Sequence, residues 1–188
     1  MNQRTGAAAQ RREPTRPIQV REERASDAPA IRRAIESAFK GRAEADVVDK
    51  LRARGGFALS LVAAHRGSVV GHVLLTAVQL VGQGPAPRGA GLAPLAVRPA
   101  FQRRGVGAAL VRAALDRARE AGYGFVVLLG NPTYYQRFGF QSASVFGLAC
   151  EFNAPEEAFM AVELAPGALA GVSGTVRYRP EFTDAVTL

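Results

Sequence analysis

The segment between Gly91 and Leu129 places the strongest constraint on how this chain can fold. An apolar run at 91–97 has the composition of a strand, and residues 105–121 repeat apolar side chains with the period of a helix. A second apolar run, 125–129, follows after a glycine that suits the end of a helix. A strand, a helix and a strand in this order predict two parallel strands joined by a right-handed crossover.

Weaker patterns on both sides of this unit predict the remaining elements. Apolar runs predict further strands at 18–21, 59–65, 69–80, 145–150, 157–164 and near 176–178. Helical periodicity predicts helices at 26–39 and 44–53, and a short helix is expected at 132–138. The fold class is therefore α/β (α+β). We expect a flexible basic N-terminal tail at 1–16 and a single domain at 17–188, because the chain of 188 residues shows no internal repeat.

The turn before the central helix has the composition of a phosphate-binding site. Gln102 and two arginines lead into Gly105 and Gly107 at the predicted start of the helix. The first amides of a helix have no intrahelical acceptor and carry partial positive charge. The glycines allow a ligand to approach the backbone closely, and the arginines add donors that suit phosphate oxygens. The sequence predicts an anion site at 102–108; the alternative is a helix start that needs glycine only to turn.

Composition narrows the class of protein. The chain carries 24 Lys and Arg residues against 16 Asp and Glu residues, and this charge of +8 suits either an anionic partner or a solvated surface. No apolar run reaches the ~20 residues of a membrane helix, and the N-terminus lacks the apolar core of a secretory signal. The single cysteine, Cys150, cannot form an intrachain disulfide. We therefore expect a cytoplasmic protein without a membrane segment or a bound metal.

The motifs and their order resemble those of the GNAT superfamily, the acyl-CoA-dependent N-acetyltransferases. The family signature after the fourth strand, Gln/Arg-x-x-Gly-x-Gly/Ala, is matched by Gln102, Gly105 and Gly107. The run YQRFGF, which begins at Tyr135, matches the Tyr-x-x-x-Gly-Phe motif expected after the next strand. An opening helix, DAPAIRRAIESAF, and a hairpin, LSLVAAHRGSVVGHVLL, occur in the matching order. The resemblance covers a motif core at roughly 18–150, and the C-terminal strands follow at 151–188.

This resemblance implies a GNAT fold, whose central mixed, mostly antiparallel sheet splays between the fourth and fifth strands and carries helices on both faces. It implies direct transfer of an acetyl group from acetyl-CoA to a primary amine in a ternary complex. Late strands often pair between subunits in similar proteins, so the resemblance leaves open whether the protein forms a homodimer. The acceptor, and whether the acyl group is longer than acetyl, are also open.

The resemblance further implies roles for individual residues. The backbone positions that would pair with the pantetheine arm and polarise the thioester carbonyl are Leu95, Ala96 and Val97. The residues that would hold the pyrophosphate are Gln102, Arg103, Arg104, Gly105, Val106, Gly107 and Ala108. Asn131 occupies a position where family members often contact the cofactor. Tyr135 matches the tyrosine that protonates the departing thiolate. For both Tyr135 and the neighbouring Tyr134, the alternative is core packing with a hydrogen-bonded hydroxyl.

The general base is unassigned, because the strand at 91–97 lacks the carboxylate that family members often place nearby. Glu44 is a candidate, although an acid at a helix start is more often explained by the helix dipole. His72 can titrate near neutral pH, but a hydrogen-bonded structural histidine is the more common case. Direct transfer needs no covalent intermediate, so Cys150 is interpreted as a core residue and not as a nucleophile.

Two alternatives come from other classes of protein. The missing carboxylate would fit a non-catalytic acyl-CoA-binding regulatory module, although retention of Tyr135 argues against it. The positive charge would fit a nucleic-acid-binding protein, but the sequence shows no basic helix, RNP-like aromatic pair or zinc spacing. The acids of the late segment could attract a cationic amine or lie in solvated loops; they are Glu151, Glu156 and Glu157.

Overall fold

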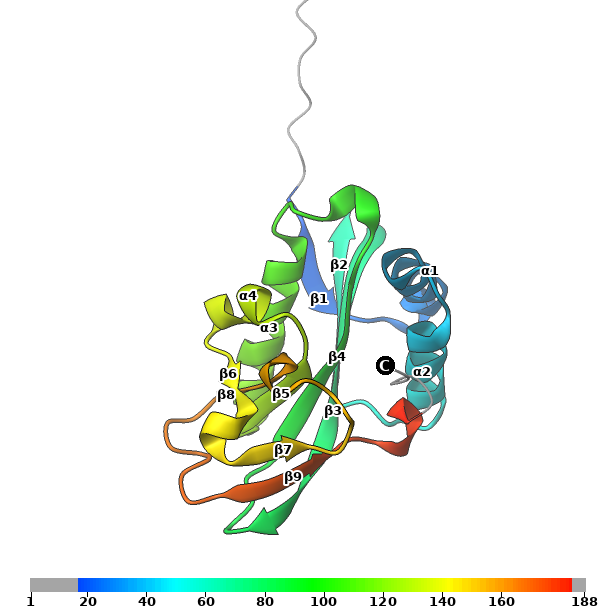
Figure 1. Ribbon diagram of the computed structural model, residues 1–188. Helices are drawn as coiled ribbons and strands as arrows, with labels where there is room; N and C mark the ends of the chain where they lie inside the picture. Colours follow the sequence, from blue (N-terminus) through cyan, green and yellow to red (C-terminus); the bar gives the residue numbers. More distant parts are fainter. Residues whose placement is uncertain (1–16, 184–188) are drawn as a thin grey trace, which may run out of the picture.

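The structure, a computed structural model that describes residues 17–183, centres on one mixed sheet (Figure 1). The strands, in their order across the sheet, are β1 (Gln19–Glu22), β2 (Leu59–His65), β3 (Ser68–Gln83), β4 (Gly89–Val97), β5 (Phe125–Leu129), β8 (Phe159–Glu163) and β6 (Gln141–Ser142). β4 and β5 run parallel, and the other neighbours in this order are antiparallel. The predicted pair of parallel strands is thus confirmed. The predicted tail at 1–16 lies outside the described residues.

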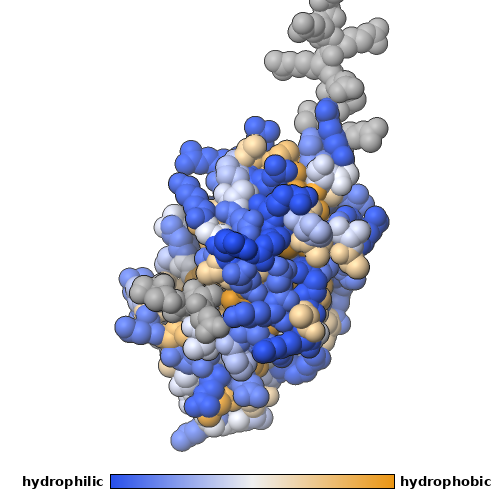
Figure 2. All heavy atoms as spheres, turned by 90° about the vertical axis from the view of Figure 1, so that its right-hand side faces the viewer, coloured by the Kyte–Doolittle hydropathy of each residue, from blue (hydrophilic) through white to orange (hydrophobic). Residues whose placement is uncertain are grey.

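Helices cover both faces of the sheet, as the resemblance implied (Figure 1). α1 (Ala28–Phe39) and α2 (Ala43–Ala53) lie on one face, and α3 (Val106–Glu120) and α4 (Pro132–Tyr135) lie on the other. The buried apolar residues that seat them are Ile31, Ile35, Val48 and Leu51 on the first face and Leu110, Val111, Ala114 and Leu115 on the second. The outer surface of α1 and α2 is mainly hydrophilic (Figure 2), as amphipathic helices require.

β4 and β5 separate after a short region of pairing. Only three positions of β4, residues 89–91, are in register with β5, so the rest of the strand has an open edge on that side. The register with β3 also shifts in this part of β4, because Leu75 pairs with Leu92 while Val73 pairs with Leu95. Two residues of β4 therefore face one residue of β3, which is a β-bulge and bends the strand. The predicted splay between the fourth and fifth strands follows from this arrangement.

A small additional sheet was not predicted. β9 (Ser173–Arg177) pairs with the far end of β3, at residues 79–83, and with β7 (Leu148–Cys150). The strand predicted at 145–150 is therefore too long, because a 3-10 turn occupies Ala143–Phe146 before β7 begins. The strand predicted near 176–178 is β9, which begins at Ser173 and ends at Arg177. β7 and β9 cover the half of the sheet face that α1 and α2 leave free, and a third apolar core forms between them and β5 and β8.

The other predicted helices and strands are present, and their ends lie within three residues of the predicted ones. The short helix expected at 132–138 consists of α4 and a following 3-10 turn, Gln136–Phe138. Within residues 17–183, no helix is long and apolar enough to cross a membrane.

Candidate active site

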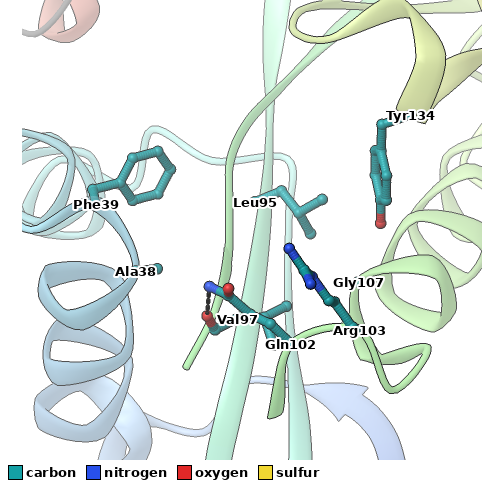
Figure 3. Close-up of a pocket in the computed structure, with 8 residues that line it drawn as sticks. All are labelled: Ala38, Phe39, Leu95, Val97, Gln102, Arg103, Gly107 and Tyr134. Carbon is teal, nitrogen blue, oxygen red and sulfur yellow. Dashed lines mark hydrogen bonds between the residues drawn. The ribbon is translucent and has the colours of Figure 1, made fainter. Parts of the chain in front are cut away.

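A pocket of about 300 Å³ lies where the open edge of β4 meets the start of α3. Its walls come from three parts of the chain: the end of α1, the C-terminal half of β4 with the following turn, and Tyr134 of α4. Figure 3 shows Phe39 and Tyr134 on opposite sides, with Leu95 and Arg103 between them. The residues that line it are Ala38, Phe39, Leu95, Val97, Gln102, Arg103, Gly107 and Tyr134.

The first turn of α3 presents free amides to this region. Gly105 precedes the helix with a φ of 81°, in the left-handed region that glycine tolerates. The first α-helical hydrogen bond runs from the amide of Ala109 to the carbonyl oxygen of Gly105, at 2.9 Å. The three amides before Ala109 therefore have no acceptor within the helix, and the helix dipole adds partial positive charge there. The side chain of Val106 is 2% exposed in the core, so this residue offers only its backbone.

The motif glutamine braces the turn. The side-chain amide of Gln102 donates a hydrogen bond of 2.9 Å to the carbonyl oxygen of Val97 (Figure 3), which closes the turn between β4 and α3. The two arginines of the motif differ. Arg103 lines the pocket and has a φ of 58°, whereas the guanidinium of Arg104 lies 5.8 Å from the centre of the Phe101 ring. The structure thus brings Arg103 to the pocket and turns Arg104 towards an aromatic neighbour.

Gly107 is required by a close approach of Tyr134. A Cβ atom built on Gly107 would lie 2.7 Å from the Tyr134 hydroxyl, which is closer than such contacts allow. Burial raises the pKa of Tyr134, and the nearby Arg137 and Arg112 partly oppose this shift. The Arg137 guanidinium lies 4.8 Å from the centre of the Tyr134 ring. Tyr134 is thus a pocket residue to which the sequence had assigned no role in the site, because it is far from the glycine motif along the chain.

Tyr135 lies deeper than its neighbour. Its ring packs against Phe138 and Phe140, and it lies so close to Gly130 that a side chain there would collide with it. Burial raises the pKa of Tyr135, and the adjacent Tyr134 adds to the shift, so the hydroxyl keeps its proton at neutral pH. Tyr135 is not among the residues that line the pocket, and its predicted role stays a prediction.

The remaining predicted cofactor residues occupy different surroundings. Leu95 and Val97 line the pocket, whereas the Ala96 side chain is fully buried in the core beneath α1 and α2. Asn131 is exposed and caps α4, because its side-chain oxygen accepts a hydrogen bond of 2.9 Å from the amide of Thr133. Ala108 lies in the first turn of α3 and is not among the residues that line the pocket.

The candidate bases are not in this pocket, and no carboxylate of the described part of the chain lines it. Glu44 lies in the first turn of α2. His72 is fully buried, and its Nε2 atom lies 2.9 Å from the Ser60 hydroxyl and 3.8 Å from a Glu23 carboxylate oxygen. Burial lowers the pKa of His72, so the structural interpretation fits it better. Burial also raises the pKa of the Cys150 thiol, which disfavours the reactive thiolate.

The sequence matches the model of the acetyltransferase (GNAT) family over residues 20–140. It is 40% identical to the uncharacterized N-acetyltransferase YhbS of Escherichia coli over 164 residues, which cover 87% of this chain and 97% of the relative. The E. coli protein YjhQ, also named an uncharacterized N-acetyltransferase, is 41% identical over 70% of this chain and 75% of its own length. The resemblance seen in the motifs is therefore confirmed.

Solved structures agree with these matches. The crystal structure of E. coli YhbS in complex with CoA has a TM-score of 0.85 and 38% identity, and the match covers 90% of this chain and 94% of that one. A GNAT acetyltransferase of Brucella melitensis in complex with acetyl-CoA has a TM-score of 0.73 and 34% identity over 88% of this chain and 98% of that one. The predicted GNAT fold is thus confirmed as well.

Proposed function

Because the chain belongs to the GNAT acetyltransferase family, we propose that it transfers an acetyl group from acetyl-CoA to a primary amine at the cleft beside β4. One observation carries this proposal. The open edge of β4 and the free amides of α3 meet in a single pocket, so an extended chain and an anionic group can be bound side by side. The complexes of two relatives with CoA and acetyl-CoA support it.

The residues present fit such a donor. Gly105 and Gly107 leave backbone uncovered at the start of α3, and a side chain on Gly107 would fill the space beside Tyr134. The amides of 106–108 and the Arg103 guanidinium would hold the pyrophosphate, while backbone groups of 95–97 would hold the pantetheine arm. Gln102 would hold the turn in shape, and Asn131, which caps the start of α4, would contact the cofactor. When bound, acetyl-CoA supplies an acetyl group activated as a thioester.

We assign the proton donor to Tyr135. Its raised pKa keeps the proton on the hydroxyl oxygen, and a positioned acid of this kind accelerates the departure of a thiolate. In the overall reaction the amine nitrogen bonds to the acetyl carbon, the carbon–sulfur bond breaks, and sulfur ends with a proton while the amine loses one. Tyr134, whose hydroxyl lines the pocket, would shape the passage to this position.

The test is thiol release from acetyl-CoA in the presence of a panel of primary amines. The wild-type protein should turn over at least one of them, and Tyr135→Phe should lower kcat by about 100-fold, since general acid catalysis contributes about 10²–10⁴-fold. Binding of acetyl-CoA without turnover of any amine would favour the alternative, a non-catalytic acyl-CoA-binding module. A kcat that is unchanged in Tyr135→Phe would overturn the assignment of the acid.

Two further parts of the proposal concern the setting of the enzyme. We propose a cytoplasmic location, which the single cysteine supports because disulfide-dense chains belong to oxidising compartments. We also propose a homodimer, and sedimentation of the purified protein tests this directly.

A further inference from the structure

A second pocket, of about 500 Å³, lies on the other side of β4 from α3. It opens beside Ala77 and Val78, between the part of β3 that pairs with β2 and the part that pairs with β9. Its remaining walls come from Glu151, which follows β7, from Arg177 at the end of β9, and from the segment after β9, including Tyr178. Much of it therefore lies outside residues 20–140, the part of the chain that the family model matches.

Tyr178 connects this pocket to the cleft. Its ring lines the pocket and also lies directly against Gly91, where a side chain would collide with it. Gly91 is the last residue of β4 that pairs with β5, so it marks the point where the two strands separate. The ring of Tyr178 is held there by Phe152 and Phe182, whose ring centres lie 5.5 Å and 5.8 Å away. The open edge of β4 thus runs from the first pocket to the inner wall of the second.

Two buried hydroxyls beside this point have no hydrogen-bond partner among residues 17–183. The hydroxyl of Tyr178 is one, and that of Thr76 is the other. Thr76 pairs with Gly91 across β3 and β4, and Gly91 lies against the ring of Tyr178, although only Tyr178 is among the residues that line the pocket. A buried polar group left unsatisfied costs about 1–3 kcal/mol, and a native structure rarely keeps two together without a reason. A ligand that hydrogen bonds to them would satisfy this need.

The charges that line the pocket have opposite signs. The Glu151 carboxylate accepts a hydrogen bond from the amide of Tyr178, which fixes its position at the pocket wall. Arg177 forms no ion pair with any residue in 17–183 and is exposed, whereas Arg179 is already paired with Glu181 at 3.1 Å. The pocket therefore offers one carboxylate and one uncommitted guanidinium. A ligand with one positive and one negative group matches this arrangement.

We propose that this pocket binds the acceptor, and that the acceptor is an amine that also carries a carboxylate, as a free amino acid does. Arg177 binds the carboxylate, Glu151 attracts the ammonium group, and the hydroxyls of Tyr178 and Thr76 hydrogen bond to the ligand near the end of the cleft. This inference rests on the proposed function, because it names the acceptor of that reaction. The ammonium group first loses a proton to solvent, and the neutral amine nitrogen then forms the bond to the acetyl carbon as the carbon–sulfur bond breaks. The second proton that the nitrogen loses balances the one that sulfur gains.

The first test compares two amines that differ by one carboxylate, L-lysine and cadaverine, as acceptors. The wild-type protein should use lysine with a kcat/KM at least tenfold higher, and Arg177→Ala should remove most of this preference by raising the KM for lysine alone. Arg33→Ala, which changes an exposed arginine of α1 outside both pockets, is the matched control and should keep the preference. Equal use of both amines by the wild-type protein would overturn the inference.

The second test separates binding from folding and needs no turnover. Tyr178→Phe keeps the ring and removes an unsatisfied hydroxyl, so the free protein should be as stable as the wild type or more stable. Titration with lysine, followed by NMR in the absence of acetyl-CoA, should show at least tenfold weaker binding. A less stable variant that binds lysine as the wild type does would overturn the inference, and Thr76→Val repeats the test should Tyr178→Phe misfold.

Acetyl-CoA titrations of the same proteins distinguish a failure of this inference from a failure of the proposed function. Binding of acetyl-CoA together with acetylation of amines regardless of a carboxylate would overturn this inference and leave the proposed function standing. A wild-type protein that binds lysine but not acetyl-CoA would overturn the proposed function, and with it the role of lysine as an acceptor.

Discussion

Gly105 and Gly67 form a natural pair for testing the anion site. Both have left-handed backbone, with φ values of 81° and 79°, and nothing lies within 4 Å of a Cβ atom built on either. Gly67 belongs to the turn between β2 and β3, whereas the open space beside Gly105 is the approach to the free amides of α3. We predict that alanine at either position lowers the free energy of unfolding by about 1 kcal/mol, because a left-handed residue with a Cβ is strained.

The two variants should differ in ligand binding. Gly105→Ala should weaken acetyl-CoA binding at least tenfold, since its methyl group occupies the approach to the helix amides, and Gly67→Ala should bind as the wild type does. Urea unfolding and calorimetric titration measure the two quantities. Equal affinities in the two variants would show that Gly105 serves only the turn.

Substitutions of Tyr134 and of Tyr135 should change different kinetic parameters. The Tyr134 hydroxyl lines the pocket beside Gly107, so Tyr134→Phe should raise the KM for acetyl-CoA a few-fold and leave kcat nearly unchanged. Tyr135→Phe should instead lower kcat, as argued above. The opposite pattern, a large fall in kcat only for Tyr134→Phe, would move the acid to the tyrosine that faces the pocket.

At the scale of elements, a partly buried ionic cluster joins α2 to the first three strands. Glu23, just after β1, pairs with Arg52 of α2 at 3.0 Å and accepts a hydrogen bond from Ser60 of β2, beside the buried His72 of β3. Burial by itself would raise the pKa of Glu23, but hydrogen bonds with His72, Arg52 and Ser60 outweigh it and lower the pKa to about 2. The cluster therefore favours an ionised Glu23.

This shift predicts how stability depends on pH. The pKa of Glu23 is lower in the folded protein than in the unfolded chain, so its contribution is complete above pH 4.5 and is lost as the pH falls towards 2. Glu23→Gln should therefore be less stable than the wild type at pH 7, with a difference that shrinks between pH 4.5 and 2. Urea unfolding across this range measures it; a constant difference would contradict the assigned role.

The sequence predicted elements well where the signal was local. The helix after Gly105 and the strands around it repeat their apolar residues with clear periods, and Gly122 ends the helix in the left-handed conformation expected of it. The pairing of β7 with β9 was missed, because it joins residues 26 positions apart whose short runs carry little periodicity.

The candidate site likewise has a part that the sequence predicted and a part that it did not. The glycine motif could be read directly, since its function depends on backbone at the start of one helix. The place of Tyr134 against Gly107 and the stacking of Arg104 on Phe101 depend on tertiary packing and could not. The second pocket depends on how the segment after β9 crosses β3 and β4, which no local pattern encodes.

At the scale of the whole molecule, the charge of +8 fits either a nucleic-acid-binding protein or an enzyme that binds one pyrophosphate. The salt dependence of ligand binding distinguishes the two. A nucleic-acid-binding protein loses affinity steeply as salt increases, because binding releases counterions from many phosphates. An enzyme that holds one pyrophosphate through helix amides and one arginine makes far fewer such contacts. We predict a shallow salt dependence for acetyl-CoA and no salt-sensitive binding of RNA in a filter-binding assay.

The central claim is that the cleft between β4 and α3 binds acetyl-CoA, and calorimetric titration of the purified protein at two salt concentrations tests it most directly. The account predicts saturable binding of one acetyl-CoA per chain, with a Kd between about 1 µM and 1 mM, the usual range for enzyme substrates. The Gly105→Ala variant should bind at least tenfold more weakly. No detectable binding to the wild-type protein at millimolar acetyl-CoA would contradict the account.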